Sequence, residues 1–227
     1  MWLSALVMLF LLALVLVSLA LRPGSAPTSA ALYPSLTPAP AEPSTVIVGG
    51  ASAAGAGASK EDNRWTSVAS ATLGWHEINQ ASVGSAITAA RPCPVRVRCS
   101  SLKDGLDDVV LAAPQVVVVA FDPVGPAGAP NEAEVSGYFR ALRQAMPDAR
   151  VIGVGPWAAT SRPGAADVAL DRSVRASVRS VRGVYISLLD PELVDASMTT
   201  ARGSALNDIG HQAVSDRVIG ALDGTAT

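Results

Sequence analysis

Short apolar runs alternate with longer amphipathic stretches along the chain from residue 45 onward. The clearest run is QVVVVAF at 115–121, and the runs at 45–50, 150–155 and 184–190 are similar. Residues 76–82 alternate between polar and apolar side chains. The pattern predicts five strands, most of them apolar enough to be buried on both faces of a parallel sheet.

Helical spacing of apolar positions predicts a helix in each interval between these strands and one after the last. The predicted helices cover residues 61–74, 101–113, 131–146, 165–183 and 207–222. Gly74 is a plausible C-cap and Asn207 a plausible N-cap. This alternation specifies a doubly wound, flavodoxin-like α/β fold, with about five parallel strands in a three-layer α/β/α arrangement. In such folds ligands bind beyond the carboxyl ends of the strands.

The N-terminal residues differ from this pattern. Residues 2–21 are apolar and uncharged, and about 20 such residues can span a bilayer. We therefore expect residues 1–22 to be a transmembrane anchor, with a signal peptide cleaved near Ala30 as the alternative. Residues 23–44, rich in Pro, Ala and Ser, predict an extended linker. The globular domain is then expected at 45–227.

Charge and cysteine content bear on where this domain works. By the positive-inside rule, Arg22 would weakly favour a cytoplasmic domain. The long spacer and the pair Cys93 and Cys99 favour the opposite side of the membrane. Two cysteines a short loop apart suit a disulfide in an oxidising compartment. We expect an extracytoplasmic domain. The net charge of −2 argues against nucleic acid as a partner, and one cysteine pair with few histidines is too little for a zinc site.

The glycine-rich stretch VGGASAAGAGAS at 48–59 follows the first strand, where a ligand site is expected. Its glycines miss the spacing of a dinucleotide fingerprint, and no Gly-Lys-Ser/Thr completes a P-loop. The remaining interpretation is a nucleophile turn, with Ser52 between a strand and the mouth of a helix. There the Ser52 amide and the positive helix end could stabilise an oxyanion.

In this stretch the chain resembles the SGNH/GDSL hydrolases, whose first block is Gly-Asp-Ser shortly after the first strand. Residues 50–52 read Gly-Ala-Ser, and Gly84 stands where the family's second-block glycine falls. The strand at 115–121 and the helix beginning NDIGHQAV also follow the family's order. The resemblance spans residues 45–222 and rests on order and spacing.

The resemblance implies a serine esterase that needs no cofactor or metal. Ser52 would attack an acyl ester, while the Ser52 and Gly84 amides and a third-block Asn would stabilise the oxyanion. Asp122 occupies the place of that Asn. A carboxylate accepts hydrogen bonds and repels an oxyanion, and loss of one such donor lowers the rate by about 10²–10³.

The family's acid and base form an Asp-x-x-His pair, which this chain can supply in two registers. In one register Asp208 and His211 are the pair. In the other, His211 belongs to a Gly-His dipeptide that the family has later, at the start of its last helix. Arg202 and Ala205 then stand in the acid and base places, and both catalytic side chains are lost.

Helix geometry favours the second register. His211 lies in line with Val214, Val218 and Leu222, along the stripe expected to pack, and Asp208 suits the first turn through the helix dipole alone. Ser52 would then be only a small residue in a tight turn, because a serine without a base is a weak nucleophile.

Two functions therefore remain open. One is a membrane-tethered esterase or acyltransferase acting on acyl esters of envelope glycans or lipids, with Ser52, His211 and Asp208 as its catalytic residues. The other is an inactive domain of the same fold that binds such glycans or lipids.

Three further features have structural interpretations, which we favour for the first two and leave open for the third. The arginines at 172–182 are expected to form the solvated face of a helix. We expect His76 at the surface. Trp157 could bind a ligand or close the core.

Overall fold

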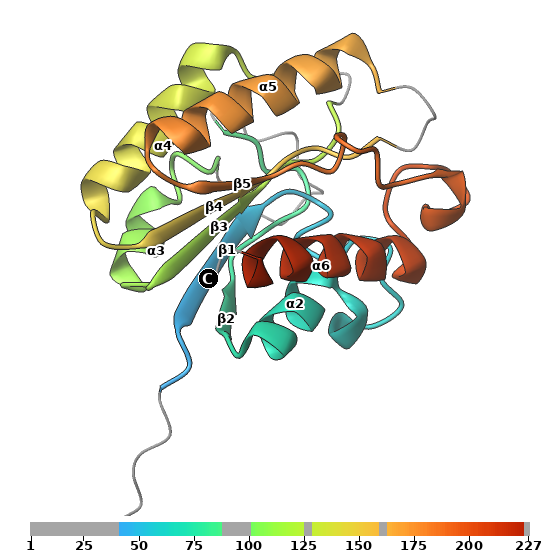
Figure 1. Cartoon of the computed structure of the whole chain (residues 1–227), viewed down its shortest axis with the longest axis horizontal. Helices are drawn as coiled ribbons and strands as arrows, with labels where there is room; N and C mark the ends of the chain where they lie inside the picture. Colours follow the sequence, from blue (N-terminus) through green and yellow to red (C-terminus); the bar gives the residue numbers. More distant parts are fainter. Residues whose placement is uncertain (1–40, 88–100, 125–128, 159–162, 225–227) are drawn as a thin grey trace, which may run out of the picture. The chain divides into compact units, whose positions relative to one another are not determined.

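Five parallel strands form one sheet in the order β2-β1-β3-β4-β5 (Figure 1). The strands are β1 (Ser44–Gly49), β2 (His76–Asn79), β3 (Val116–Ala120), β4 (Arg150–Val154) and β5 (Val184–Ile186). The computed structural model describes residues 41–87, 101–124, 129–158 and 163–224. This strand order is that of flavodoxin-like sheets, so the α/β fold and strand count expected from the sequence are confirmed.

The register places apolar side chains side by side at the centre of the sheet. Val46 of β1 pairs with Val117 of β3 and with Ile78 of β2, and Val117 pairs in turn with Val151 of β4. Val46, Val117 and Val151 are at most 1% exposed. A strand buried on both faces has no polar face to alternate with, which is why the sequence shows continuous apolar runs here.

Helices cover both faces of the sheet (Figure 1). Helices α2 (Trp65–Leu73) and α6 (Asp208–Asp223) lie side by side on one face, while α4 (Glu132–Ala145) and α5 (Ala165–Ser180) pack together on the other. The short helix α3 (Leu106–Leu111) lies on the same face as α4 and α5, because its Val109 belongs to the hydrophobic core that these helices cover.

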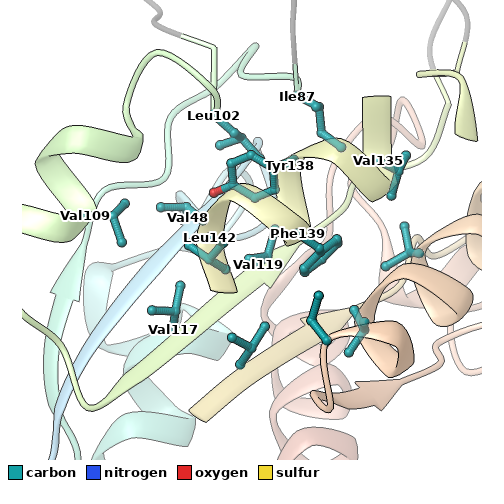
Figure 2. Packing of buried hydrophobic residues seen from close by; sticks show 14 of the residues in the cluster. Val48, Ile87, Leu102, Val109, Val117, Val119, Val135, Tyr138, Phe139 and Leu142 are labelled. Carbon is teal, nitrogen blue, oxygen red and sulfur yellow. The ribbon is translucent and has the colours of Figure 1, made fainter. Parts of the chain in front are cut away.

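The core beneath α4 contains aromatic side chains in contact with one another (Figure 2). Phe139 is fully buried, and its ring centroid lies 6.3 Å from that of Phe121 and 5.8 Å from that of Tyr138. Burial raises the pKa of the Tyr138 phenol, whose hydroxyl has no hydrogen-bond partner among the described residues. The aromatic core thus reaches the carboxyl end of β3, where Phe121 follows the strand.

The helix limits differ from expectation mainly at N-termini. Residues Glu61–Asn63 form a separate 3-10 turn, and α2 begins only at Trp65. A second such turn, Ala196–Met198, was not expected. Gly74 ends α2 in the left-handed conformation, and the Asn207 side chain caps α6 by accepting from the Gly210 N–H, as predicted.

Residues Glu42–Thr227 form one compact unit. The expected anchor at residues 2–21 lies outside the described residues, as do Cys93 and Cys99. Among the residues that the structure describes, no helix is both long and apolar enough to cross a membrane. The limits of the anchor and linker therefore stay predictions.

Candidate functional site

Ser52 lies just beyond β1, in a series of turns rather than at the start of a helix. The turns are closed by hydrogen bonds from Ala54 N–H to the Gly50 carbonyl (3.0 Å) and from Ala56 N–H to the Ala51 carbonyl (2.8 Å). The expectation that Ser52 faces the mouth of a helix is therefore wrong. Gly55, with φ of +86°, interrupts helical geometry three residues later. No helix dipole acts on the Ser52 amide.

Asp122, directly after Phe121 at the end of β3, is bonded to the Ser52 turn. One carboxylate oxygen accepts from the Ala51 N–H and the other accepts from the Ser52 N–H at 3.1 Å. Gly50 permits this approach, because a Cβ atom there would overlap the Asp122 carboxylate. The amide that would stabilise an oxyanion at Ser52 is thus already donating to an internal carboxylate.

Gly84 lies in the loop after β2, next to the Ser52 turn. The Ser82 N–H donates to the Gly49 carbonyl at 3.1 Å, which holds the loop beside the end of β1. The Ser85 carbonyl and the Asp122 carboxylate both lie near the position that a Cβ atom of Gly50 would take, so the Gly84 loop and Asp122 meet beside the Ser52 turn. The structure therefore brings Ser52, Gly84 and Asp122 to one edge of the sheet, as the sequence predicted.

His211 is fully buried in the first turn of α6. Its Nδ1 accepts from the Trp65 N–H at 3.4 Å, and its Nε2 lies 3.2 Å from the Ala56 carbonyl oxygen. Because a backbone N–H needs an acceptor, we assign the proton to Nε2, which then donates to Ala56. Both ring nitrogens are engaged with the backbone. Val214 and Val218, in line with His211 on α6, are buried too, which confirms the predicted packed stripe.

Asp208 contacts the same 56–65 segment as His211 but through different residues. Its carboxylate accepts from the Ser59 N–H at 2.8 Å, the Ser59 hydroxyl at 2.6 Å and the Asn63 Nδ2 at 3.0 Å. The Ser59 hydroxyl and amide are the main causes that lower the pKa of Asp208. Asp208 thus fastens the 59–63 segment to α6, and no hydrogen bond between Asp208 and His211 occurs in the described structure.

The alternative pair lies in the loop before α6. Arg202 is exposed and Ala205 is half-buried. The Thr200 N–H donates to the Ala205 carbonyl at 2.9 Å, and Leu206, fully buried, lies against Gly57 of the Ser52 loop. Position 205 is therefore in a segment that packs against the Ser52 loop.

Burial shifts the titration of His211, with a measurable consequence. Desolvation is the largest cause that lowers the pKa of the imidazole below the ordinary value of 6.5. Since the unfolded chain binds the proton more readily, the free energy of unfolding should fall as pH drops from about 6.5 toward the folded-state pKa. Urea unfolding between pH 7.5 and 5 should show this loss.

The matched control for this pH dependence is the chain's other histidine. His211→Gln should remove the slope near pH 6, whereas His76→Gln, at an exposed position, should keep it. A slope that survives in the His211 variant would contradict a buried, neutral imidazole.

A cavity of about 340 Å³ lies beside Asp122 and Gly84. Phe121, Leu102 and Leu170 contribute apolar walls, and each is less than 10% exposed. The sequence does not mark these residues as part of a site, because each belongs to an apolar run or stripe that is equally typical of a core. Neither Ser52 nor His211 lines this cavity.

Comparison with known proteins gave no match to a family model or to a curated protein sequence. Solved structures do match. TesA has a TM-score of 0.63 at 14% identity, over 80% of this chain and 98% of that one. Est24, a carbohydrate acetylesterase from Sinorhizobium meliloti, has a TM-score of 0.62 at 13% identity, over 81% and 100%. A family two carbohydrate esterase from Clostridium thermocellum in complex with cellohexaose has a TM-score of 0.57 at 16% identity, over 83% and 66%.

These neighbours are SGNH/GDSL esterases. The domain has the SGNH-hydrolase fold. The fold confirms the resemblance seen in residues 45–222. The correspondence of Ser52, Gly84 and Asp122 to the family's blocks stays a prediction.

A second polar cluster of this SGNH domain lies at the end of β5. Asp171, 7% exposed, accepts from the Tyr185 hydroxyl and from the Ser187 hydroxyl at 2.9 Å, and Arg175 lies 3.3 Å from its other oxygen. Burial and the Asp171 carboxylate raise the pKa of Tyr185. In the sequence, the spacing of four residues between Asp171 and Arg175 indicates that the two side chains can pair on one face of a helix. The cluster anchors α5 to the sheet.

The remaining candidates take structural positions. His76 is exposed, and Trp157 is 4% exposed and packs in the core beneath α6. Arg172 and Arg179 are exposed, whereas Arg175 is bound to Asp171, so the arginine series is only partly a solvated face. Within the described ranges, no group of three or more His, Cys, Asp or Glu side chains could hold a metal ion.

Proposed function

We propose that this SGNH domain binds its ligand without hydrolysing esters at Ser52. The observation that carries the proposal is the environment of His211: the imidazole is fully buried, and both its nitrogens are bonded to the Ala56 and Trp65 backbone. A serine hydroxyl needs a base within about 3 Å to become an effective nucleophile. The other histidine, His76, lies at the amino end of β2, so the sequence offers no second imidazole near Ser52.

The state of the oxyanion site supports the same conclusion. An ester carbonyl arriving at Ser52 would have to displace the Asp122 carboxylate from the Ser52 amide. It would also meet a negative charge where the transition state develops its own. Preorganised donors normally contribute most of the stabilisation at such sites, and here the donor faces an acceptor from the same chain.

The second candidate function is ester hydrolysis by Ser52, His211 and Asp208, with Gly84 as oxyanion donor. It is favoured by the SGNH fold itself, since the structural neighbours named above are esterases. For this function His211 would have to leave both backbone partners and turn toward Ser52, and Asp208 would have to leave Ser59.

The ligand we propose is a glycan or lipid of the cell envelope, met by a domain tethered outside the membrane. The apolar segment at 2–21, the Pro-rich spacer at 23–44 and the pair Cys93 and Cys99 support this location. The carbohydrate esterase bound to cellohexaose shares the fold and supports a sugar-containing ligand by analogy. Retention of the chain in membranes after carbonate extraction tests the tether.

The decisive experiment for the absence of catalysis is labelling of the full chain with a fluorophosphonate probe. We expect no labelling above that of Ser52→Ala, because an unactivated serine attacks phosphorus too slowly. Labelling that is lost in both Ser52→Ala and His211→Ala would instead establish the esterase.

A further inference from the structure

The side-chain charge that lines the cavity beside Asp122 is negative. Its apolar walls include Phe121 and Leu170, and Asp122 is the charged residue among the described ones that line it. No described Lys, Arg or His forms an ion pair with Asp122. The wall therefore presents a negative acceptor without a compensating cation.

The Asp122 carboxylate still has capacity to accept. It receives hydrogen bonds from the Ala51 and Ser52 amides, one at each oxygen, whereas a carboxylate offers about four lone-pair positions. A ligand group that meets Asp122 must therefore donate. Ester carbonyls and carboxylates cannot donate, so neither can form a hydrogen bond with the Asp122 carboxylate.

Gly84 supplies the complementary group. It lines the same cavity, and its backbone N–H donates to no residue of the described structure. The lining of the cavity thus offers the Gly84 N–H as a donor and Asp122 as an acceptor, while the Ser85 hydroxyl, also in the lining, is bonded to that of Ser82. A hydroxyl group satisfies both, because it donates one hydrogen bond and accepts others.

We propose that this cavity binds an alcohol, with its hydroxyl donating to Asp122 and accepting from the Gly84 N–H and its apolar body against Phe121 and Leu170. The inference rests on the proposed function, since it assigns the ligand class of a site used for binding. The ligand proposed here is the free alcohol of a glycan or lipid and not its acyl ester. A volume of about 340 Å³ is ample, as an apolar cavity of about 150 Å³ accommodates benzene.

Benzyl alcohol and anisole test this directly, because they are isomers of equal size and differ in the hydrogen-bond donor. Each is titrated against the full chain held in phosphatidylcholine nanodiscs, with ligand-observed NMR giving Kd. We expect benzyl alcohol to bind roughly tenfold or more tightly than anisole, the effect of one hydrogen bond to a charged group. Benzoate, an anion, should bind more weakly than either.

Three variants locate the site of this preference. Asp122→Ala should remove the difference between the isomers, whereas Asp223→Ala, the same charge change at an exposed site on α6, should preserve it. Ala86→Phe, at a half-buried lining position, should weaken binding of both isomers by filling the cavity, and it keeps the test available if Asp122→Ala does not fold.

Equal affinity for the isomers, tighter binding of benzoate, or unchanged binding to Ala86→Phe would each overturn the inference. Tighter, Asp122-dependent binding of benzylamine would overturn the assignment to an alcohol. These readouts involve no turnover. Fluorophosphonate labelling of Ser52 would therefore contradict the proposal that the domain does not hydrolyse esters. The preference for an alcohol would still be decided by the titrations.

Discussion

A chain carrying Asp122→Asn, Arg202→Asp and Ala205→His is expected to hydrolyse p-nitrophenyl acetate at least about 10²-fold faster than the wild-type chain. The first change frees the Ser52 amide from a carboxylate and supplies an amide donor. The other two place an Asp-x-x-His pair in the loop before α6, which packs against the Ser52 loop through Leu206 and Gly57.

The size of the effect follows from what a triad contributes. Loss of a triad member leaves only about 10³–10⁴ of acceleration over water, from binding and the oxyanion site. The wild-type chain has neither an available base nor a free Ser52 amide, so restoring both should give at least the gain of roughly 10²–10³ assigned to one oxyanion donor. Release of p-nitrophenol over several hours measures this.

Ser52 provides the control for the rebuilt site. Ser52→Ala should abolish the gain in the rebuilt chain and should leave the slow wild-type rate unchanged. A folded rebuilt chain without any gain would contradict the register that places Arg202 and Ala205 at the catalytic positions. Wild-type turnover that Ser52→Ala and His211→Ala both remove would instead show that the buried imidazole can reach the serine.

The sheet could be predicted because its strands are buried on both faces. A run such as Val116–Ala120 has few alternatives to a central parallel strand, and the alternation with helices then fixes the architecture. The burial of His211 followed from helical periodicity in the same way, since Val214 and Val218 define the packed side of α6. Local pattern was sufficient for these features.

The partners of the site residues could not be predicted, because they come from distant parts of the chain. Ala56 meets His211 across 155 positions, and Ser59 meets Asp208 across 149. No periodicity encodes such contacts. The position of Asp122 near Ser52 was foreseeable from the strand order, but its bond to the Ser52 amide was not.

Gly57→Ala is expected to destabilise the domain by roughly 3 kcal/mol, from about 1–2 for a side chain in the left-handed region and about 1–3 for overpacking. Gly57 has φ of +89°, and a Cβ atom there would overlap the Leu206 carbonyl oxygen and lie 3.1 Å from Thr200 Cγ2. Leu206 is fully buried. The backbone of the Ser52 loop must therefore move away from the start of α6.

Gly74→Ala separates the two contributions to this loss. Gly74 also has positive φ, +64°, but no atom lies within 4 Å of the added Cβ, so its loss should be about 1–2 kcal/mol from the backbone alone. Urea unfolding of both variants gives the difference. Desolvation is the largest cause that lowers the pKa of His211, and the bond to Ala56, next to Gly57, raises it. Movement of the Ser52 loop in Gly57→Ala should expose the imidazole to water, so we expect the NMR-measured pKa of His211 to rise toward 6.5 even though the bond to Ala56 weakens, whereas Gly74→Ala should leave it unchanged. Equal losses in the two variants would show that the Ser52 loop does not depend on its close contact with the segment before α6.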